Sequence, residues 1–182
     1  LPYLHADAQC VSAWRHKISP QASNALKIGL VWKGSVGFEN DADRSLMNLE
    51  VLSPLWRVPG VRFISLQKGA GEDQAKCPPP SQPLLDIGTH MTDFADAAAI
   101  IVQLDLVITV DTAMAHLAGA LGKPCWLMLP AYKTDWRWLT ERVDSPWYPG
   151  VMRLYRQPVS GNWTAVVAKL QADLAQLVAT HR

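Results

Sequence analysis

Short, nearly continuous hydrophobic runs alternate along the chain with segments in which hydrophobic residues recur every three or four positions. Continuous runs are typical of parallel strands, because such strands are buried on both faces of their sheet. The clearest runs are Lys27–Trp32, Val61–Leu66, Leu104–Val110 and Cys125–Leu129, and two weaker ones are Leu84–Ile87 and Met152–Tyr155. We therefore predict a parallel sheet built from these segments.

The segments between the runs predict helices with one hydrophobic face. One such face begins at Phe94, and Thr92 or Asp93 can cap the start of that helix. Similar patterns at residues 7–18 and from Asn162 onward predict a helix near each end of the chain.

Two segments are less regular. Residues 46–58 contain Pro54, and Ser53-Pro54 predicts that a new short helix begins there, with proline in its first turn. Residues 69–83 include three consecutive prolines, which predicts a surface loop.

Strands that alternate with helices predict an α/β protein, a three-layer Rossmann-like open parallel sheet with helices on both faces. At 182 residues the chain is long enough for one domain and short for two. We expect one domain, in which residues 1–24 form a connecting helix, residues 25–160 a Rossmann-like core and residues 161–182 a C-terminal helix.

Composition narrows the class of protein. The chain is 49% hydrophobic and 18% charged with a net charge of +1, which is typical of a soluble globular protein and not of a nucleic-acid binder. No apolar run approaches the roughly 20 residues that span a membrane. Cys10, Cys77 and Cys125 have neither metal-site nor disulfide-framework spacing, which favours a reducing, cytoplasmic location. Because the chain begins at Leu1 without a signal-like segment, we expect it to be part of a larger protein.

Open α/β sheets bind ligands at the carboxyl ends of their strands, so the residues after each strand are the ones to inspect. The glycines near the first strand do not form a dinucleotide-binding fingerprint, and neither a P-loop nor a nucleophile elbow occurs. Asp41 and Asp43 have the spacing of a magnesium-binding pair, but their loop ends in Arg44, which favours a solvated surface. The sequence therefore predicts neither a metal nor a cofactor.

The junction after Val110 is the most informative. A helix predicted from Asp111 to Leu121 would present free backbone N–H groups and a partial positive charge, which suit a phosphate. Thr112 can add a hydroxyl donor, and His116 projects from the same side one turn later. Alternatively, Asp111 only caps the helix and His116 is an ordinary polar residue. The residues alone leave both interpretations open.

The segment Val110–Pro124, with the sequence VDTAMAHLAGALGKP, closely resembles the C-terminal domain of glycosyltransferase family 9 proteins, which include the heptosyltransferases of lipopolysaccharide synthesis. It is more similar still to the glycosyltransferase-like domains that follow tetratricopeptide repeats in bacteria, relatives of the O-linked GlcNAc transferases. Further matching pieces, among them Arg44-Ser45, Thr92–Asp96 and Asp135–Trp138, cover nearly the whole chain in the same order.

The resemblance implies the C-terminal half of a GT-B fold, the half that binds a nucleotide sugar. It implies a donor site around the diphosphate and the sugar, made of Ser35, Arg44, Asp111, Thr112, Ala113 and His116, with Met91 and Thr92 near the base. Within this set, the backbone N–H groups of Thr112 and Ala113 would hold the diphosphate and Arg44 would neutralise it.

The activity that the resemblance implies is inverting, metal-independent sugar transfer. An acceptor hydroxyl attacks the anomeric carbon, and the helix dipole and cations stabilise the nucleoside diphosphate that leaves. In the heptosyltransferases the general base comes from the N-terminal domain. We therefore expect this chain to bind a nucleotide sugar without turnover, and to have that acceptor domain and tetratricopeptide repeats as partners.

Two other functions stay open. A sugar-nucleotide epimerase can share the GT-B fold, but only His116 and Asp111 are available as its acid and base. A degenerate domain could instead act as a scaffold, although the intact Asp111, Thr112, His116 and Arg44 favour a working site.

The tryptophan-rich segments have no role that follows from the pattern. They contain Trp136, Trp138, Trp147 and Tyr148. For these side chains the sequence favours core packing, or an interface with the missing domain, over stacking against a sugar.

Overall fold

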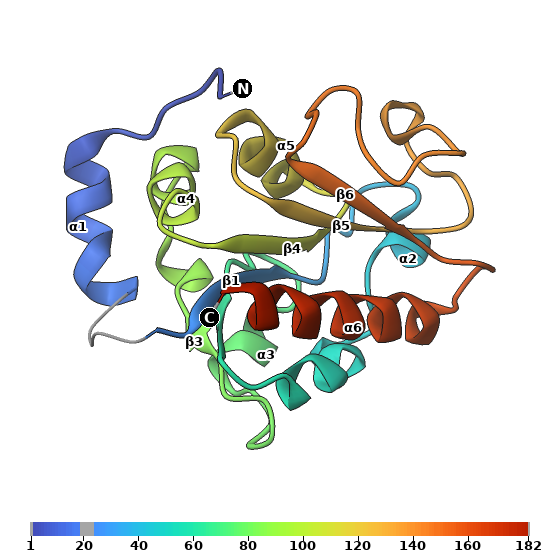
Figure 1. Cartoon of the computed structure of the whole chain (residues 1–182), viewed down its shortest axis with the longest axis horizontal. Coiled ribbons are helices and arrows are strands. Elements are labelled where there is room, and N and C mark those ends of the chain that lie inside the picture. Colours follow the sequence, from blue (N-terminus) through green and yellow to red (C-terminus); the bar gives the residue numbers. More distant parts are fainter. Residues whose placement is uncertain (1, 19–23, 182) are drawn as a thin grey trace.

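The computed structural model describes residues 2–18 and 24–181. Within these residues one sheet contains six strands, all parallel, in the order β3-β2-β1-β4-β5-β6 (Figure 1). The strands are β1 (Leu26–Val31), β2 (Val61–Ser65), β3 (Leu85–Asp86), β4 (Leu106–Val110), β5 (Cys125–Leu129) and β6 (Met152–Arg156). The predicted α/β fold with an open parallel sheet is therefore confirmed.

Helices cover both faces of this sheet, which gives the predicted three layers (Figure 1). One face carries α1 (Ala8–Ile18), α4 (Phe94–Ile101) and α5 (Ala113–Ala120). The other face carries the 3-10 helix η1 (Leu49–Arg57) and the long helix α6 (Trp163–His181). Short helical turns lie in the connections, namely α2 (Asp41–Arg44), α3 (Glu72–Lys76), η2 (Gly88–His90) and η3 (Trp136–Trp138).

Alternate residues of each strand enter two separate hydrophobic cores. In β5, Cys125, Leu127 and Leu129 pack beneath α4 and α5, whereas Trp126 and Met128 pack on the face covered by α6. Because successive side chains point to opposite faces and both faces are buried, the strand sequence is hydrophobic throughout. This explains the continuous runs from which the strands were predicted.

Two local predictions differ from the structure. The new helix expected at Ser53 is wrong, because η1 continues through Pro54 without interruption. Its leucines 49, 52 and 55 are all buried against α6, and this common hydrophobic face offsets the hydrogen bond that proline cannot donate. The loop expected at residues 69–83 contains the short helix α3.

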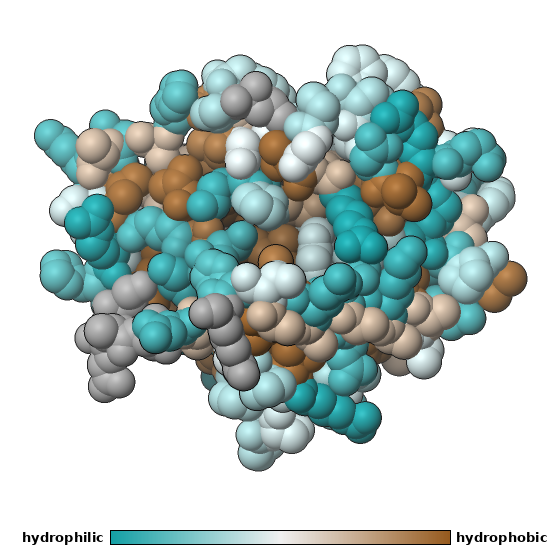
Figure 2. All heavy atoms as spheres, viewed as in Figure 1, coloured by the Kyte–Doolittle hydropathy of each residue, from teal (hydrophilic) through white to brown (hydrophobic). Residues whose placement is uncertain are grey.

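The ends of the chain carry the two expected helices, α1 and α6. The proposed boundaries at residues 24 and 160 stay predictions, and residues 1, 19–23 and 182, on which part of them falls, lie outside the described residues. Hydrophobic side chains on the face shown in Figure 2 form separate patches interrupted by hydrophilic ones. Among the described helices, none has the length and apolar character needed to cross a bilayer.

The order of the strands creates a crevice between β1 and β4. From β1 the chain continues to β2 and β3 on one side, and from β4 it continues to β5 and β6 on the other. The connections that follow these two neighbouring strands therefore diverge in opposite directions. In open α/β sheets such a switch point, at the carboxyl ends of the strands, is the usual ligand site.

Candidate functional site

A cavity of about 570 Å³ opens at this switch point. The connections after β1 and β2 and the first residues of α4 and α5 line it. The described residues that line it include three cationic side chains, Lys33, Arg44 and Lys68, and no carboxylate, while Asp41 and Glu72 pair with Arg44 and Lys68 from outside the lining. A concentration of positive charge in a partly enclosed site favours an anionic ligand.

Arg44 is held in place by three groups. Its Nη1 donates to the backbone oxygen of Asp111 at 2.9 Å, and its Nε donates to Asp41 Oδ1 at 3.2 Å. Its guanidinium lies 4.0 Å from the centre of the Phe38 ring. Only 11% of the side chain is exposed. Arg44 therefore joins the connection after β1 to the end of β4 and presents its remaining N–H groups from a fixed position.

The connection after β1 is organised by Asp41. Its Oδ1 accepts from Ser45 Oγ at 2.7 Å, and Ser45 Oγ accepts from the backbone N–H of Gly34 at 2.8 Å. Asp41 is therefore a structural carboxylate that fixes Arg44, and the prediction that it only faces solvent is wrong.

The side chain of Gln67 joins the connections that follow β1 and β2 at the same edge of the sheet. Its Oε1 accepts from the backbone N–H groups of Trp32 at 2.9 Å and Lys33 at 3.0 Å. Its Nε2 donates to the backbone oxygens of Lys33 at 3.0 Å and Ala70 at 2.7 Å. The side chain is fully buried, so it replaces solvent for backbone groups that the sheet leaves unpaired.

The start of α5 forms the opposite wall of the cavity. Thr112 caps the helix, since its Oγ1 accepts from the backbone N–H of Met114 at 3.3 Å. The interpretation of Asp111 as the cap is therefore wrong, because the capping residue is Thr112, whose backbone is extended, and α5 begins at Ala113. Within the described residues, the N–H groups of Thr112 and Ala113 have no hydrogen-bond partner. Such groups carry the partial positive charge of a helix start.

Asp111 and His116 lie on the side of α5 toward β5 and β6. His116 Nδ1 lies 2.9 Å from Tyr148 Oη, and its ring stacks on Trp138 with the centroids 5.0 Å apart. Burial lowers the pKa of His116 below its ordinary value, and the carboxylate of Asp111 opposes this shift. Burial raises the pKa of Asp111, against the opposing effects of Trp138, His116 and Arg44. The pair therefore favours the neutral form of each side chain.

We expect Asp111→Asn to raise the free energy of unfolding at neutral pH. The pKa of Asp111 is higher in the folded than in the unfolded chain, so the folded protein loses stability as pH rises through that interval, and the cost persists above it. Urea denaturation at pH 7 and below pH 4 measures the difference between variant and wild type. The advantage of the variant should shrink in acid. A variant that is less stable than wild type at pH 7 would contradict the assignment.

A smaller cavity of about 180 Å³ adjoins the first on the side of α4. The two share Lys68, Phe94 and Met114, and Met91 and Thr92 line the smaller one. Thr92 is fixed because both its N–H and its hydroxyl donate to Asp96 Oδ2, at 2.8 and 2.7 Å. The ring of Phe94 is 61% exposed at the mouth of both cavities.

The structure divides the predicted site residues into three groups. Ser35, Arg44, Thr112 and Ala113 line the switch-point cavity. Met91 and Thr92 line the adjoining cavity, whereas Asp111 and His116 face the aromatic residues near β6. Thr112 and His116, expected to act from one side of the helix, therefore lie in different cavities.

Sequence reasoning did not assign Lys33, Gln67 or Lys68 to the site. Lys33 and Lys68 line the cavity, and Gln67 shapes it. Their common signal is that each follows a strand directly or by a few residues, at the carboxyl edge where ligands bind.

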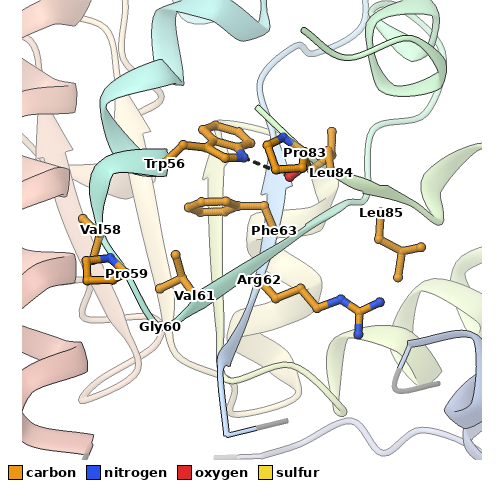
Figure 3. Close-up of a pocket in the computed structure, with 10 residues that line it drawn as sticks. All are labelled: Trp56, Val58, Pro59, Gly60, Val61, Arg62, Phe63, Pro83, Leu84 and Leu85. Carbon is orange, nitrogen blue, oxygen red and sulfur yellow. Dashed lines mark hydrogen bonds between the residues drawn. The ribbon is translucent and has the colours of Figure 1, made fainter. Parts of the chain in front are cut away.

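Another hollow, of about 530 Å³, lies at the opposite end of β2 (Figure 3). The rings of Trp56 and Phe63 lie 4.2 Å apart there, and Trp56 Nε1 donates to the backbone oxygen of Pro83 at 2.9 Å. Arg62 supplies its one cation among the described lining residues, and Figure 3 shows this side chain directed away from the two rings. This hollow lacks a helix start and lies away from the switch point.

Comparisons with known proteins show which family and which structures the chain resembles. Residues 88–126 match the model of glycosyltransferase family 9 (heptosyltransferase). Protein FlbA of Caulobacter vibrioides is 29% identical over 187 residues, which cover 98% of this chain and 30% of FlbA. The chain therefore spans about a third of that relative.

Two solved structures share the fold. The E. coli ADP-heptose lps heptosyltransferase II matches 98% of this chain and 54% of its own with a TM-score of 0.64 and 16% identity. The E. coli heptosyltransferase WaaC with ADP matches 100% and 51% with a TM-score of 0.55 and 14% identity. The chain thus spans about half the length of these proteins. Residues 88–126 are therefore similar to glycosyltransferase family 9, and the chain has the fold of one half of these GT-B heptosyltransferase structures.

Proposed function

We propose that this chain is the donor-binding domain of an inverting, metal-independent glycosyltransferase, and that it holds a nucleoside diphosphate sugar by its diphosphate. The observation that carries the proposal is the switch-point cavity, which combines three cations, the start of α5 and no lining carboxylate. This is the arrangement that a multiply charged phosphate ligand requires.

Each wall of the cavity has a role in this proposal. The N–H groups of Thr112 and Ala113 donate to one phosphate, while Arg44 and Lys33 neutralise the charge from the opposite wall. The exposed hydroxyl of Ser35 is a further donor at the rim. Because Arg44 is already fixed by Asp41 and by the backbone of Asp111, little conformational entropy is lost when a ligand binds.

The base of the nucleotide belongs in the adjoining cavity. Met91 and Phe94 offer hydrophobic contact there, and the backbone and side chain of Thr92 are positioned by Asp96. Lys68 lies between the two cavities, where the ribose and the first phosphate meet. A flat ring on an aromatic or thioether side chain is a common mode of base contact.

The proposed chemistry is a single displacement. An acceptor hydroxyl oxygen bonds to the anomeric carbon as the bond from that carbon to the diphosphate oxygen breaks with inversion. The bonding electron pair leaves with the nucleoside diphosphate, where Arg44, Lys33 and the start of α5 stabilise it. The hydroxyl proton passes to a base outside this chain, because the chain spans only about half of its structural relatives.

ADP is the first nucleotide to consider, because one of the similar solved structures is described as a complex with ADP. A sugar-nucleotide epimerase is less favoured, since the acid/base pair that the described residues place near the site, Asp111 and His116, is turned toward Tyr148 and Trp138. A scaffold that binds no ligand is also less favoured, because that function does not account for free N–H groups at the start of α5 beside three cations.

Isothermal titration calorimetry with ADP, UDP, GDP and dTDP tests the proposal. We expect one nucleotide to bind selectively and Arg44→Ala to weaken it by about 10- to 100-fold, the value of charge-assisted hydrogen bonds worth about 1.5–3 kcal/mol. Arg62→Ala is the matched control, because it removes the same charge from the hollow in Figure 3. Equal weakening by both variants, or no binding of any nucleotide up to millimolar concentration, would contradict the proposed site.

A further inference from the structure

A third cavity, of about 350 Å³, lies beside α5, where His116 lines it one turn after the residues that line the switch-point cavity. We define it as the aromatic pocket, lined by Tyr3, His116, Trp136, Arg137, Trp147 and Tyr148. Four of its residues come from the connection between β5 and β6, the segment whose tryptophans had no assigned role. The proposed diphosphate site does not use these side chains.

The aromatic side chains of this connection divide into two groups. Trp138 and Tyr148 are buried in the core, as the sequence favoured, and they pack against His116. Trp136 and Trp147 are 65% and 52% exposed. Core packing therefore does not explain the second pair. Two large exposed rings side by side are unusual on a soluble protein and mark a binding surface.

The two exposed rings are held in a fixed arrangement. They meet edge to face, with centroids 5.8 Å apart and planes at 87°. Trp147 Nε1 donates to the backbone oxygen of Arg137 at 3.1 Å. The Arg137 guanidinium lies 4.8 Å from the centre of the Trp136 ring and pairs with both oxygens of Asp135, at 3.0 and 2.9 Å. The pocket is thus preorganised, so a ligand need not order it.

The polar groups of the pocket are close to neutral overall. The charge of Arg137 is matched by Asp135, and burial lowers the pKa of His116, which favours its uncharged form. His116 and the hydroxyl of Tyr148 contact each other at 2.9 Å. Aromatic faces with a few neutral donors and acceptors fit a ligand that has both C–H faces and hydroxyl groups. A saccharide ring has this character, whereas a free anion or an aliphatic chain does not.

The position of the pocket agrees with that chemistry. Across the order of the strands, the cavity of Met91 and Thr92 lies on the side of β3, the switch-point cavity lies between β1 and β4, and the aromatic pocket lies on the side of the connection between β5 and β6. Asp111 lies between the last two, with its backbone bound to Arg44 and its carboxylate near Trp138 and His116. A nucleotide sugar has its base, diphosphate and sugar in the same linear order.

We propose that the aromatic pocket binds a saccharide ring, with Trp136 and Trp147 as its stacking surface. The placement rests on the proposed function, since it puts the ring at the sugar end of a bound donor. The ring belongs either to the donor or to a saccharide acceptor, and the chemistry of recognition is the same for both.

Calorimetry on the 182-residue chain separates these two sources. The first arm compares each nucleoside diphosphate with its sugar derivative, namely ADP with ADP-glucose and ADP-heptose, UDP with UDP-N-acetylglucosamine, GDP with GDP-mannose and dTDP with dTDP-glucose. The second arm uses free lactose, maltose and chitotriose. Each arm is repeated with Trp136→Ala, and with Val143→Ala as a control for the loss of an exposed apolar side chain. Thermal unfolding verifies that both variants fold.

If the ring is that of the donor, a sugar derivative binds at least fivefold more tightly than its diphosphate, and Trp136→Ala abolishes this gain while leaving the affinity for the diphosphate unchanged. If it is that of an acceptor, a free saccharide binds and Trp136→Ala weakens it at least fivefold. The inference is overturned if Trp136→Ala changes neither arm relative to Val143→Ala, or if no saccharide-containing probe shows a contribution from its sugar. Failure of the proposed function appears separately, as no binding of any diphosphate, and the second arm still tests the pocket.

Discussion

Replacement of Gln67 by leucine is expected to lower the free energy of unfolding by about 3 kcal/mol. Leucine has a similar volume but offers neither donor nor acceptor. The N–H groups of Trp32 and Lys33 and the backbone oxygens of Lys33 and Ala70 would then lose their partners in a buried or partly buried environment. Each unsatisfied buried group costs about 1–3 kcal/mol. Relaxation of the loop lets some of the four groups find other partners, so the expected loss of stability is smaller than the sum of their costs.

Urea denaturation followed by tryptophan fluorescence measures this loss. Gln176→Leu is the matched control, because it makes the same substitution on the exposed side of α6 and should change stability by no more than about 0.5 kcal/mol. Gln67→Leu should also bind the nucleoside diphosphate more weakly than the wild type does, because Gln67 positions Lys33 and the connection after β1. A loss of less than about 1 kcal/mol would show that the brace is dispensable.

Gly88→Ala is expected to destabilise the protein by a similar amount, about 3 kcal/mol, near the upper end for overpacking. A methyl group at this position would overlap the backbone oxygen and nitrogen of Gln67. Neither atom can move without disturbing the end of β2, so the strain has no flexible side chain to absorb it. The glycine is needed for the close approach of η2 to β2 and not for an unusual backbone angle.

Gly161→Ala separates these two reasons for glycine. Gly161 has a φ of +80° but open space where a Cβ would lie. Alanine there should lower the free energy of unfolding by about 1 kcal/mol, the cost of the left-handed backbone conformation alone. Thermal or urea denaturation of both variants makes the comparison. If Gly88→Ala is no less stable than Gly161→Ala, the proposed backbone overlap is not what fixes glycine at residue 88.

The sequence was sufficient for the fold because burial on both faces leaves an unmistakable pattern. The strands and the two longest helices follow from where hydrophobic residues recur. Asp93 was one of two predicted caps for α4, and its side chain does accept from the N–H of Asp96. Position along the strands also placed Arg44 and Thr112 at the correct edge of the sheet.

What the sequence could not show depends on contacts between distant residues. Asp111 and Thr112 are equally suitable caps, and the structure uses Thr112, whose backbone is extended, while the backbone oxygen of Asp111 accepts from Arg44. Gln67 stands in a polar segment that resembles an exposed loop, and only the meeting of two strand ends makes it a buried brace. Likewise, the turn η3 buries Trp138 and leaves Trp136 exposed. The sequence has no periodic pattern there from which the two could be told apart.

The order of the strands also limits the order in which the layers of the domain can form as the chain is synthesised. On the ribosome β1, β2 and β3 emerge first, and the second edge of β1 stays open until β4 follows. The layer formed by α4 and α5 can then close. The leucine face of η1, made among the first elements, has to wait for the 19 residues of α6, which follow every strand in the chain. Until that helix arrives, the nascent domain carries an uncovered hydrophobic face, the state in which a growing chain most needs a chaperone.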